Sequence, residues 1–304
     1  MKIIILFSLL SLFTYGNNLF EKEISIETIN SISHEYVYDP NNLDYKLSEL
    51  IWETEDISML AIKLSYTLKG DLFIKFDGKI NISSEAKMDD YDWLKGDQTQ
   101  WSDWSTHPNT IVDKYNIIDL SLNRRLDTRF NIEQNINIGF KYDDKRYKAY
   151  DGSYIYSSQD GFRDQFGTFS GLGITYSEQF SSIYVGIDGK LKLNSLIVKA
   201  ALKYSPFVNI TNSDTHHLRY FTNENSFDTT SMVNIEASVL YPIEENIFFG
   251  LIFESLNYSK TDGVTTRTYY SGATEAEAGS VYKYNGAAIQ SSYEVFNLAL
   301  MVKF

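Results

Sequence analysis

Apolar and polar residues alternate along much of this 304-residue chain, and the C-terminal segment shows the pattern most clearly. Phe296, Leu298, Leu300, Val302 and Phe304 are large and apolar, and one smaller or more polar residue separates each from the next. Successive side chains of a strand point to opposite faces, so these five would share one face. A half-exposed strand of a soluble sandwich could show the same alternation. A strand that also ends on an aromatic residue is typical of the last strand of an outer-membrane β-barrel.

Eight further segments have the residue types and the length of strands. They are Met59–Lys69, Leu72–Ile82, Asn116–Arg124, Asn131–Tyr142, Ser182–Leu193, Leu196–Tyr204, Ser231–Tyr241 and Asn246–Tyr258. Tight turns are predicted at Gly70-Asp71, Leu126–Arg129, Asn194-Ser195 and Pro242–Glu245, and polar loops over residues 83–115, 143–172, 205–230 and 259–292. We therefore predict an all-β fold, a transmembrane antiparallel β-barrel of about ten strands with short periplasmic turns and long extracellular loops.

The N-terminus predicts export from the cytoplasm. Met1-Lys2 is a basic start, residues 3–15 are a short apolar run, and Gly16 is a small residue suited to cleavage. This arrangement indicates a signal peptide over residues 1–16. No later stretch approaches the roughly twenty apolar residues that a membrane helix needs. The rest of the chain, residues 17–304, is predicted to be a single barrel in a bacterial outer membrane.

Composition agrees with a barrel and limits the partners. The chain has 23 Tyr, 19 Phe and only 4 Pro, and aromatic residues favour strands and the interfacial girdles of barrels. It has no cysteine, which excludes disulfides and thiolate metal sites. The net charge of −13 argues against a nucleic-acid partner and suits a cationic substrate.

Two pairs of ionisable residues in the predicted loops are candidates for chemistry. Asp90 and Asp92 are two apart, so an extended segment would place both carboxylates on one side, where they could share a proton. Asp214 and His216 have the same spacing, which lets a carboxylate orient an imidazole as a general base. A metal site at Asp214, His216 and His217 is disfavoured because adjacent histidines on a strand point to opposite sides, and no metal site is predicted.

These pairs lie within blocks that resemble the omptins, a family of outer-membrane proteases built as ten-stranded barrels. The similar blocks are Met88-x-Asp90-x-Asp92-Trp93, Trp101-x-Asp103-x-x-x-His107-Pro108-x-Thr110, the run Gly152-Ser-Tyr-Ile-Tyr-Ser-Ser158-x-x-Gly161-Phe-Arg-Asp164, and Ser213-Asp214-x-His216. The resemblance covers essentially the whole mature chain. It implies an aspartyl endopeptidase whose site lies in the extracellular loops, facing outside, and which cuts next to basic residues, preferably between two of them.

The resemblance also implies roles for individual residues. His216, oriented by Asp214, would activate a water molecule held against Asp90 and Asp92, without a covalent intermediate. A further set is implied to bind the substrate: Glu35 at the floor of the pocket for the residue before the cut, Met88 and Ile174 along its walls, Asp103 facing the residue after the cut, and Asn212. Omptins usually have an aspartate where this chain has Asn212, so we expect a weaker preference for basic residues.

Omptins also need lipopolysaccharide for activity. Tyr142, Asp144 and Arg146 resemble the cluster that binds it, with Asp144 in place of a glutamate. A further expected arginine falls on Gln179, and the expected lysine has no clear counterpart after His217. Lipopolysaccharide dependence is therefore an open question at this point, and no other cofactor is predicted.

Two other classes of function are compatible with a surface barrel. A non-enzymatic adhesin would use its loops for binding, but it would need neither the Asp/Asp nor the Asp/His pair. A small channel is disfavoured because side chains fill most of the lumen of a barrel of about ten strands.

Overall fold

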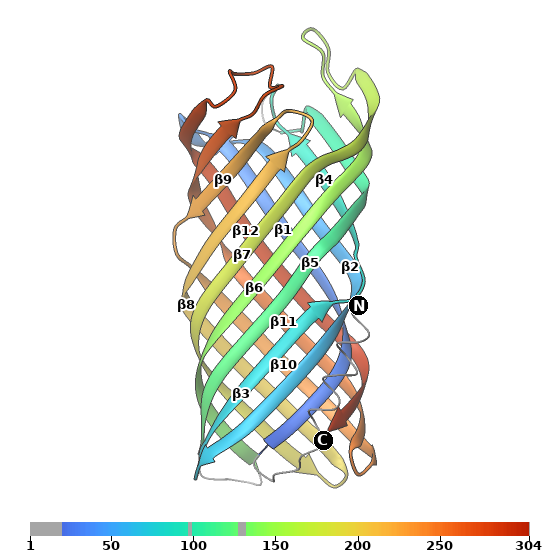
Figure 1. The fold of residues 1–304 in the computed structure, drawn as a ribbon, viewed down its shortest axis with the longest axis vertical. Helices are drawn as coiled ribbons and strands as arrows, with labels where there is room; N and C mark the ends of the chain where they lie inside the picture. The colour runs from blue at the N-terminus through green and yellow to red at the C-terminus, as the bar shows by residue number, and fades with distance from the viewer. Residues whose placement is uncertain (1–19, 97–98, 127–131, 304) are drawn as a thin grey trace.

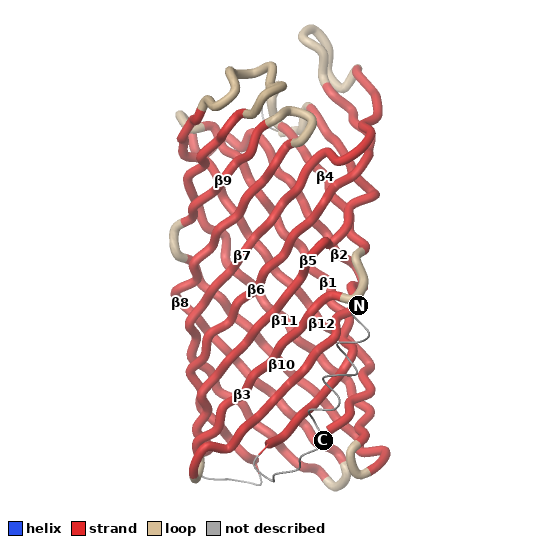
Figure 2. The backbone as a smooth tube through the Cα atoms, in the orientation of Figure 1, coloured by secondary structure: helices blue, strands red, loops and turns tan. Residues whose placement is uncertain are grey.

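The computed structural model describes residues 20–96, 99–126 and 132–303, which form a single closed cylinder of antiparallel strands (Figure 1). The predicted signal peptide, Phe304 and most of the turn predicted at Leu126–Arg129 lie outside these residues. None of the described segments is a helix long and apolar enough to cross a membrane. Strands make up most of the wall, and the longer loops gather at one end, which we call the loop end; the tight turns mark the turn end (Figure 2).

Twelve strands are present in the described chain. They are β1 (Phe20–Asp39), β2 (Asn42–Lys69), β3 (Leu72–Asn81), β4 (Glu85–Asp92), β5 (Asp103–Arg125), β6 (Ile132–Tyr156), β7 (Gln165–Leu193), β8 (Leu196–His216), β9 (Phe221–Phe227), β10 (Thr230–Glu244), β11 (Ile247–Tyr269) and β12 (Val281–Lys303). β3 and β4 both lie between β2 and β5, and β9 and β10 both lie between β8 and β11. β3 and β4 therefore share one position around the ring, and β9 and β10 share another, so the ring has ten strand positions. β1 closes the ring by pairing with both β2 and β12.

The outer face of the turn-end half is apolar. Alternate residues of neighbouring strands are exposed there, such as Ile136 and Ile138 on β6 and Val185 on β7. On β12, Phe296 is 71% exposed and Leu298 is 65% exposed, while Met301 is buried, which confirms the predicted two-faced terminal strand. An apolar outer belt on a closed barrel is the structure that lipid requires.

Large aromatic side chains fill the middle of the lumen. Trp52, Tyr115, Tyr147, Tyr176, Phe180, Tyr258 and Tyr293 are all almost fully buried. The Trp52 ring stacks on Tyr176 at 4.9 Å between centroids, and Phe180 stacks on Tyr258 at 4.2 Å. This packing agrees with a lumen filled by side chains.

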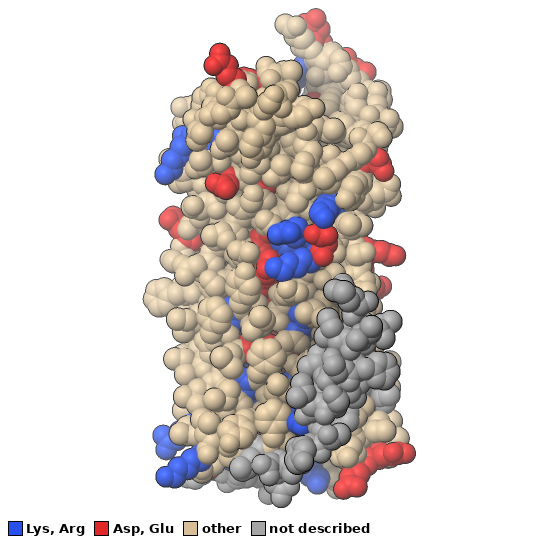
Figure 3. Space-filling view, viewed as in Figure 1, with Lys and Arg blue, Asp and Glu red and all other residues tan. Residues whose placement is uncertain are grey.

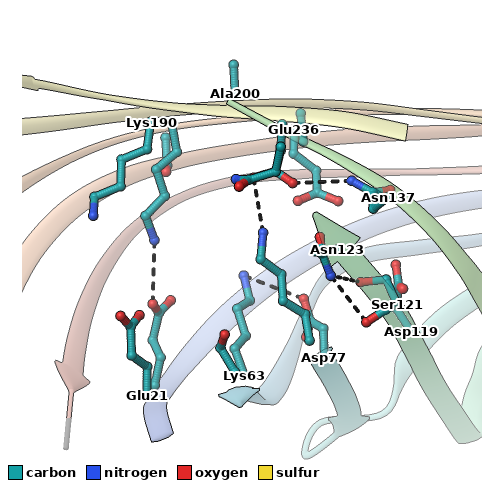
Figure 4. A pocket seen from close by; sticks show the side chains of 18 of the residues that line it. Glu21, Lys63, Asp77, Asp119, Ser121, Asn123, Asn137, Lys190, Ala200 and Glu236 are labelled. Atoms are coloured by element: carbon teal, nitrogen blue, oxygen red, sulfur yellow. Dashed lines mark hydrogen bonds and ion pairs between the residues drawn. The ribbon is translucent and has the colours of Figure 1, made fainter. Parts of the chain in front are cut away.

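On the turn side of this aromatic layer the lumen is charged. A cavity of about 310 Å³ there is lined by basic and acidic side chains that face one another (Figure 4). Lys203 Nζ lies 2.8 Å from Asp119 Oδ2 and 2.5 Å from Glu236 Oε1, and Lys63 Nζ lies 3.7 Å from Asp77 Oδ2. Also inside the lumen, Lys79 Nζ bridges Glu27 and Glu254 at 2.8 and 2.6 Å.

The strands extend much further than the sequence predicted. In each of the four segments that were predicted to be long loops, most residues belong to strands. The loops that remain in these segments at the loop end are residues 93–102, 157–164, 217–220 and 270–280. The predicted strand ends were wrong because the sequence analysis recognised a strand only where its outer face was apolar. Past the lipid belt the wall is charged outside, as at Arg146 and Lys148 of β6, although its hydrogen-bond ladder with β5 and β7 continues.

Candidate active site

The residues predicted to be catalytic lie on strands and not in loops, which corrects the expected placement. Asp90 and Asp92 belong to β4, and Asp214 and His216 end β8. Going around the ring, β4 and β8 are separated by β5, β6 and β7, so the two pairs face each other across the lumen near the loop end. Alternation along each strand turns both members of a pair inward, as the spacing of two predicted.

Asp214 and His216 form a close pair. His216 Nε2 lies 2.6 Å from Asp214 Oδ2, and Asn223 Nδ2 donates to the same oxygen at 3.3 Å. The Phe221 ring, which is opposite His216 in the β8–β9 ladder, stacks on the imidazole at 4.4 Å. Asp214 is buried, so the imidazole is held between a carboxylate and an aromatic face. Because Nε2 contacts Asp214, the other ring nitrogen, Nδ1, is the one that could accept a proton from a water molecule.

Asp90 and Asp92 form the opposing wall. Ser48 Oγ of β2 donates to Asp90 Oδ1 at 3.0 Å. Burial, followed by the charge of Asp92, raises the pKa of Asp90 well above its ordinary value. Burial also raises the pKa of Asp92 to about 6. The pair therefore keeps a proton to a higher pH than exposed aspartates do. Asp89 points outward instead, with Oδ2 2.5 Å from Lys87 Nζ.

The two walls are close enough to influence each other electrostatically. The charge of Asp214 contributes to the raised pKa of Asp90, after burial and Asp92. Burial raises the pKa of Asp92, whereas the charges of Arg219 and His216 lower it. An imidazole on one side of the lumen and a proton-bearing carboxylate pair on the other form a set of groups that can deprotonate a water molecule and donate a hydrogen bond to a developing oxyanion.

Glu35 lies on β1, within electrostatic reach of Asp214 and Asp90, and is only 3% exposed. Asn225 Nδ2 donates to its Oε1 at 3.2 Å, whereas Oε2 has no hydrogen-bond partner in the part of the chain that the structure describes. Burial, together with the charges of Asp214 and Asp90, raises the pKa of Glu35 well above its ordinary value. A buried carboxylate oxygen without a partner is costly, and a cationic ligand would relieve that cost.

The other residues predicted to bind substrate have different surroundings. Met88 and Ile174 are both buried. Met88 lies on the same face of β4 as Asp90, and Ile174 of β7 is opposite His216 of β8 in the ladder. Asn212 is also buried, and its Oδ1 accepts from Asn225 Nδ2 at 2.6 Å.

Asp103 is mainly tied to a loop. Its Oδ2 accepts from Ser102 Oγ at 2.6 Å, and its Oδ1 accepts from the backbone N–H of Ser157 at 3.0 Å. Asp103 also pairs with Asp92 across β4 and β5. It therefore anchors the loop after β6 at the loop end of the barrel.

Sequence reasoning missed several residues that orient the site, namely Ser48, Tyr176, Asn223, Asn225 and Arg219. Asn223 and Asn225 are again two apart, the spacing that identified the two acidic pairs. That signal was available, but a pair of amides does not titrate and did not stand out. Ser48 carried no signal, because its partner Asp90 is 42 residues away.

His216 and His217 contact different groups. His217 Nε2 lies 2.8 Å from Thr175 Oγ1, away from Asp214. The described residues contain no group of three or more His, Asp or Glu side chains arranged to hold a metal ion.

Tyr142, Asp144 and Arg146 lie on the outer wall of β6, in a patch where basic and acidic side chains gather over β5 and β6 (Figure 3). The Asp144 carboxylate forms an ion pair with Lys114 and accepts from Tyr142 OH at 3.5 Å. Asp113 Oδ2 lies 3.9 Å from Arg146 Nη1, and its Oδ1 lies 2.9 Å from Lys148 Nζ. The patch thus contains two lysines that the sequence analysis did not identify.

Comparison with known proteins gives a consistent set of relatives. The model of the Omptin family matches residues 17–304. The chain is 27% identical to the plasminogen activator of Yersinia pestis over 76% of this chain and 72% of that protein. It is 25% identical to the outer membrane protease OmpP of Escherichia coli over 91% and 88% of the two chains. The crystal structure of the outer membrane protease OmpT from Escherichia coli superposes with a TM-score of 0.85 at 22% identity, covering 96% of this chain and 99% of that one.

Proposed function

The chain belongs to the omptin family, and we propose that it is an outer-membrane endopeptidase that cuts exposed peptide bonds next to basic residues, with dibasic pairs preferred. The observation that carries this proposal is the 2.6 Å contact between His216 and Asp214, facing the proton-bearing pair Asp90 and Asp92. The site would open at the loop end of the barrel, which we place outside the cell.

The proposed reaction uses water as the nucleophile. His216 takes a proton from a water molecule held between the two walls, and the resulting hydroxide attacks the scissile carbonyl carbon. Asp214 holds the imidazole in place and stabilises its positive charge. The protonated member of the Asp90/Asp92 pair donates a hydrogen bond to the oxygen as it becomes negative. His216 then returns its proton to the leaving amine.

Charge and burial support a basic residue before the cut. Glu35 offers a buried oxygen without a partner, and Met88 and Ile174 provide apolar surface for the stem of a long basic side chain. Asp103 is proposed to face the residue after the cut from the rim, and Asn212 to lie beside Glu35.

Lipopolysaccharide is proposed to be required for activity and to bind at Tyr142, Asp144 and Arg146. Lys114 and Lys148 lie in the same patch and could replace the basic residues that are missing at Gln179 and after His217. Basic side chains favour phosphate through charge-assisted hydrogen bonds.

The test is cleavage of a quenched-fluorescence peptide containing Arg-Arg by the refolded barrel with lipopolysaccharide. His216→Ala and the double variant Asp90→Asn/Asp92→Asn should each lose most of the activity while the barrel keeps its heat-modifiable migration. Asp89→Asn is the matched control, because its side chain faces outward. Fluorophosphonates and chelators should not inhibit the wild type. Activity in the His216→Ala barrel, or labelling of a serine with equal loss of activity, would refute the mechanism.

A further inference from the structure

A buried ion pair lies on the turn side of Glu35, and the proposed reaction does not use it. Lys145 Nζ is 3.0 Å from Glu178 Oε1, and both side chains are almost completely buried. Ser33 Oγ donates to the same oxygen at 2.6 Å. An ionised carboxylate can only accept hydrogen bonds, so each neighbour of Glu178 has to donate to it.

A chain of hydrogen bonds connects Glu178 with Glu35, and its donors point away from Asn225 toward both carboxylates. Tyr176 OH donates to Glu178 Oε2 at 3.2 Å, and the same hydroxyl oxygen accepts from Asn212 Nδ2 at 3.3 Å. Asn212 Oδ1 accepts from Asn225 Nδ2 at 2.6 Å, and Asn225 Nδ2 also donates to Glu35 Oε1 at 3.2 Å. We call these five residues the relay.

The charge of Glu178 fixes the orientation of both amides in the relay. Because Tyr176 must donate to Glu178, its oxygen is left as an acceptor, and the NH₂ group of Asn212 turns toward it. The Asn212 oxygen then faces Asn225, and Thr265 Oγ1 completes the arrangement by donating to Asn225 Oδ1 at 2.7 Å. Within the relay, Glu35 Oε2 is the carboxylate oxygen left without a partner.

We propose that Glu178 is a positioning residue that orients the relay, and that the resulting pocket, with one free carboxylate oxygen, selects lysine over arginine before the cut. This inference deepens the proposed function and rests on it. An ammonium is a compact charge that one strong acceptor can neutralise. A guanidinium is bound best by two parallel hydrogen bonds to both oxygens of a carboxylate, and Asn225 already occupies Glu35 Oε1.

The surroundings of the pocket are consistent with this choice. Burial and the nearby acids Asp214, Asp90 and Glu178 raise the pKa of Glu35, so a compact cation beside it supplies charge that this region lacks. The buried Trp52 ring stacks on Tyr176 at 4.9 Å and so restricts where the relay hydroxyl can lie.

The experiment compares two peptides that differ only in Lys or Arg before the cut. The wild type should have a kcat/KM about tenfold higher for the Lys peptide, the factor expected from one charged hydrogen bond. Tyr176→Phe removes the relay hydroxyl but keeps the ring, so the ratio should fall to about twofold, mainly through KM. Tyr147→Phe is the matched control, since Tyr147 also packs on Trp52, at 5.3 Å, but does not belong to the relay. Its ratio should equal that of the wild type.

A second variant tests the inference without Tyr176. Asn212→Asp removes the donor to the Tyr176 oxygen and adds an acceptor beside Glu35, so the preference should shift toward Arg. A wild type that cuts the Arg peptide as well or better, or ratios unchanged in both Tyr176→Phe and Asn212→Asp, would overturn the inference.

Binding separates this inference from the proposed function. The two peptides are titrated by calorimetry into the His216→Ala barrel in lipopolysaccharide micelles. Tighter binding of the Lys peptide supports the inference even if the wild type cuts neither peptide, a result that would overturn the proposed function alone. Equal binding overturns the inference even if both peptides are cut.

Discussion

Asp214→Asn is the perturbation that tests the site most directly. The carboxylate accepts from His216 at 2.6 Å and from Asn223 at 3.3 Å, and it is buried. The amide has the same shape but no charge, and it can present an N–H group to the imidazole. A buried hydrogen bond to a charged group contributes about 1.5–3 kcal/mol. At about 1.4 kcal/mol per factor of ten, kcat/KM should fall about 10- to 150-fold, mostly through kcat.

The same substitution should also move the pH dependence. After burial and Asp92, the charge of Asp214 contributes to the raised pKa of Asp90. Removing that charge lowers the pKa of Asp90, so the Asp90/Asp92 pair loses its proton at a lower pH than in the wild type. In the proposed reaction, this proton stabilises the oxyanion. The alkaline limb of the kcat/KM profile should therefore shift to lower pH in the variant.

The assay is the pH profile of kcat/KM for both proteins with one Lys peptide at saturating lipopolysaccharide. Asp89→Asn is the control, because it makes the same chemical change on the outer face of β4, where the partner is Lys87. Its profile should match that of the wild type. A loss of less than threefold in Asp214→Asn, or an alkaline limb that stays in place or moves to higher pH, would contradict the assigned roles.

Two further predictions concern the wall of the barrel. Lys79→Met leaves Glu27 and Glu254 without their shared cation in the lumen, and it should destabilise the barrel by about 3–5 kcal/mol, measured as a lower urea midpoint of unfolding in detergent. Lys75→Met is the control and should lower the free energy of unfolding by at most about 1 kcal/mol, since Lys75 is 41% exposed. Equal destabilisation by the two substitutions would show that the buried bridge contributes no more than an exposed ion pair. Arg146→Ala should raise the lipopolysaccharide concentration needed for half-maximal activity without lowering the maximum rate, and an unchanged titration would exclude the patch as the lipid site.

The sequence predicted the fold because lipid imposes a simple pattern. Phe296 and Leu298 alternate with smaller residues because one face of β12 meets the membrane, and the structure exposes both. The alternation of apolar and polar residues did not predict the strands beyond the membrane. Past Asp143 the outward side chains of β6 include the charged Asp144, Arg146 and Lys148, so the apolar outer face disappears although the ladder with β7 continues. Strand length past the membrane is decided by pairing with neighbours, which a local pattern does not contain.

The parts of the candidate site that could be predicted are the two pairs whose members lie on the same strand. The two pairs Asp90/Asp92 and Asp214/His216 each depend on a spacing of two, and the structure turns both pairs inward. The relay was not predictable in this way. Asn225 reaches Glu35 across 190 positions in the sequence, and its role depends on which strands the closed ring brings together.

A rigid strand wall has a consequence for the acids that it carries. Glu35, Asp90 and Asp214 lie on β1, β4 and β8, and each strand is paired on both sides, so the three carboxylates cannot move apart to reduce their repulsion. Burial, followed by the charges of Asp214 and Asp90, raises the pKa of Glu35, and burial, followed by the charges of Asp92 and Asp214, raises the pKa of Asp90. A basic side chain that binds beside Glu35, as proposed above, would pair with this carboxylate and reduce the repulsion at Glu35. Under the proposed function, the paired strands thus keep these acids close together until a basic side chain of the substrate enters.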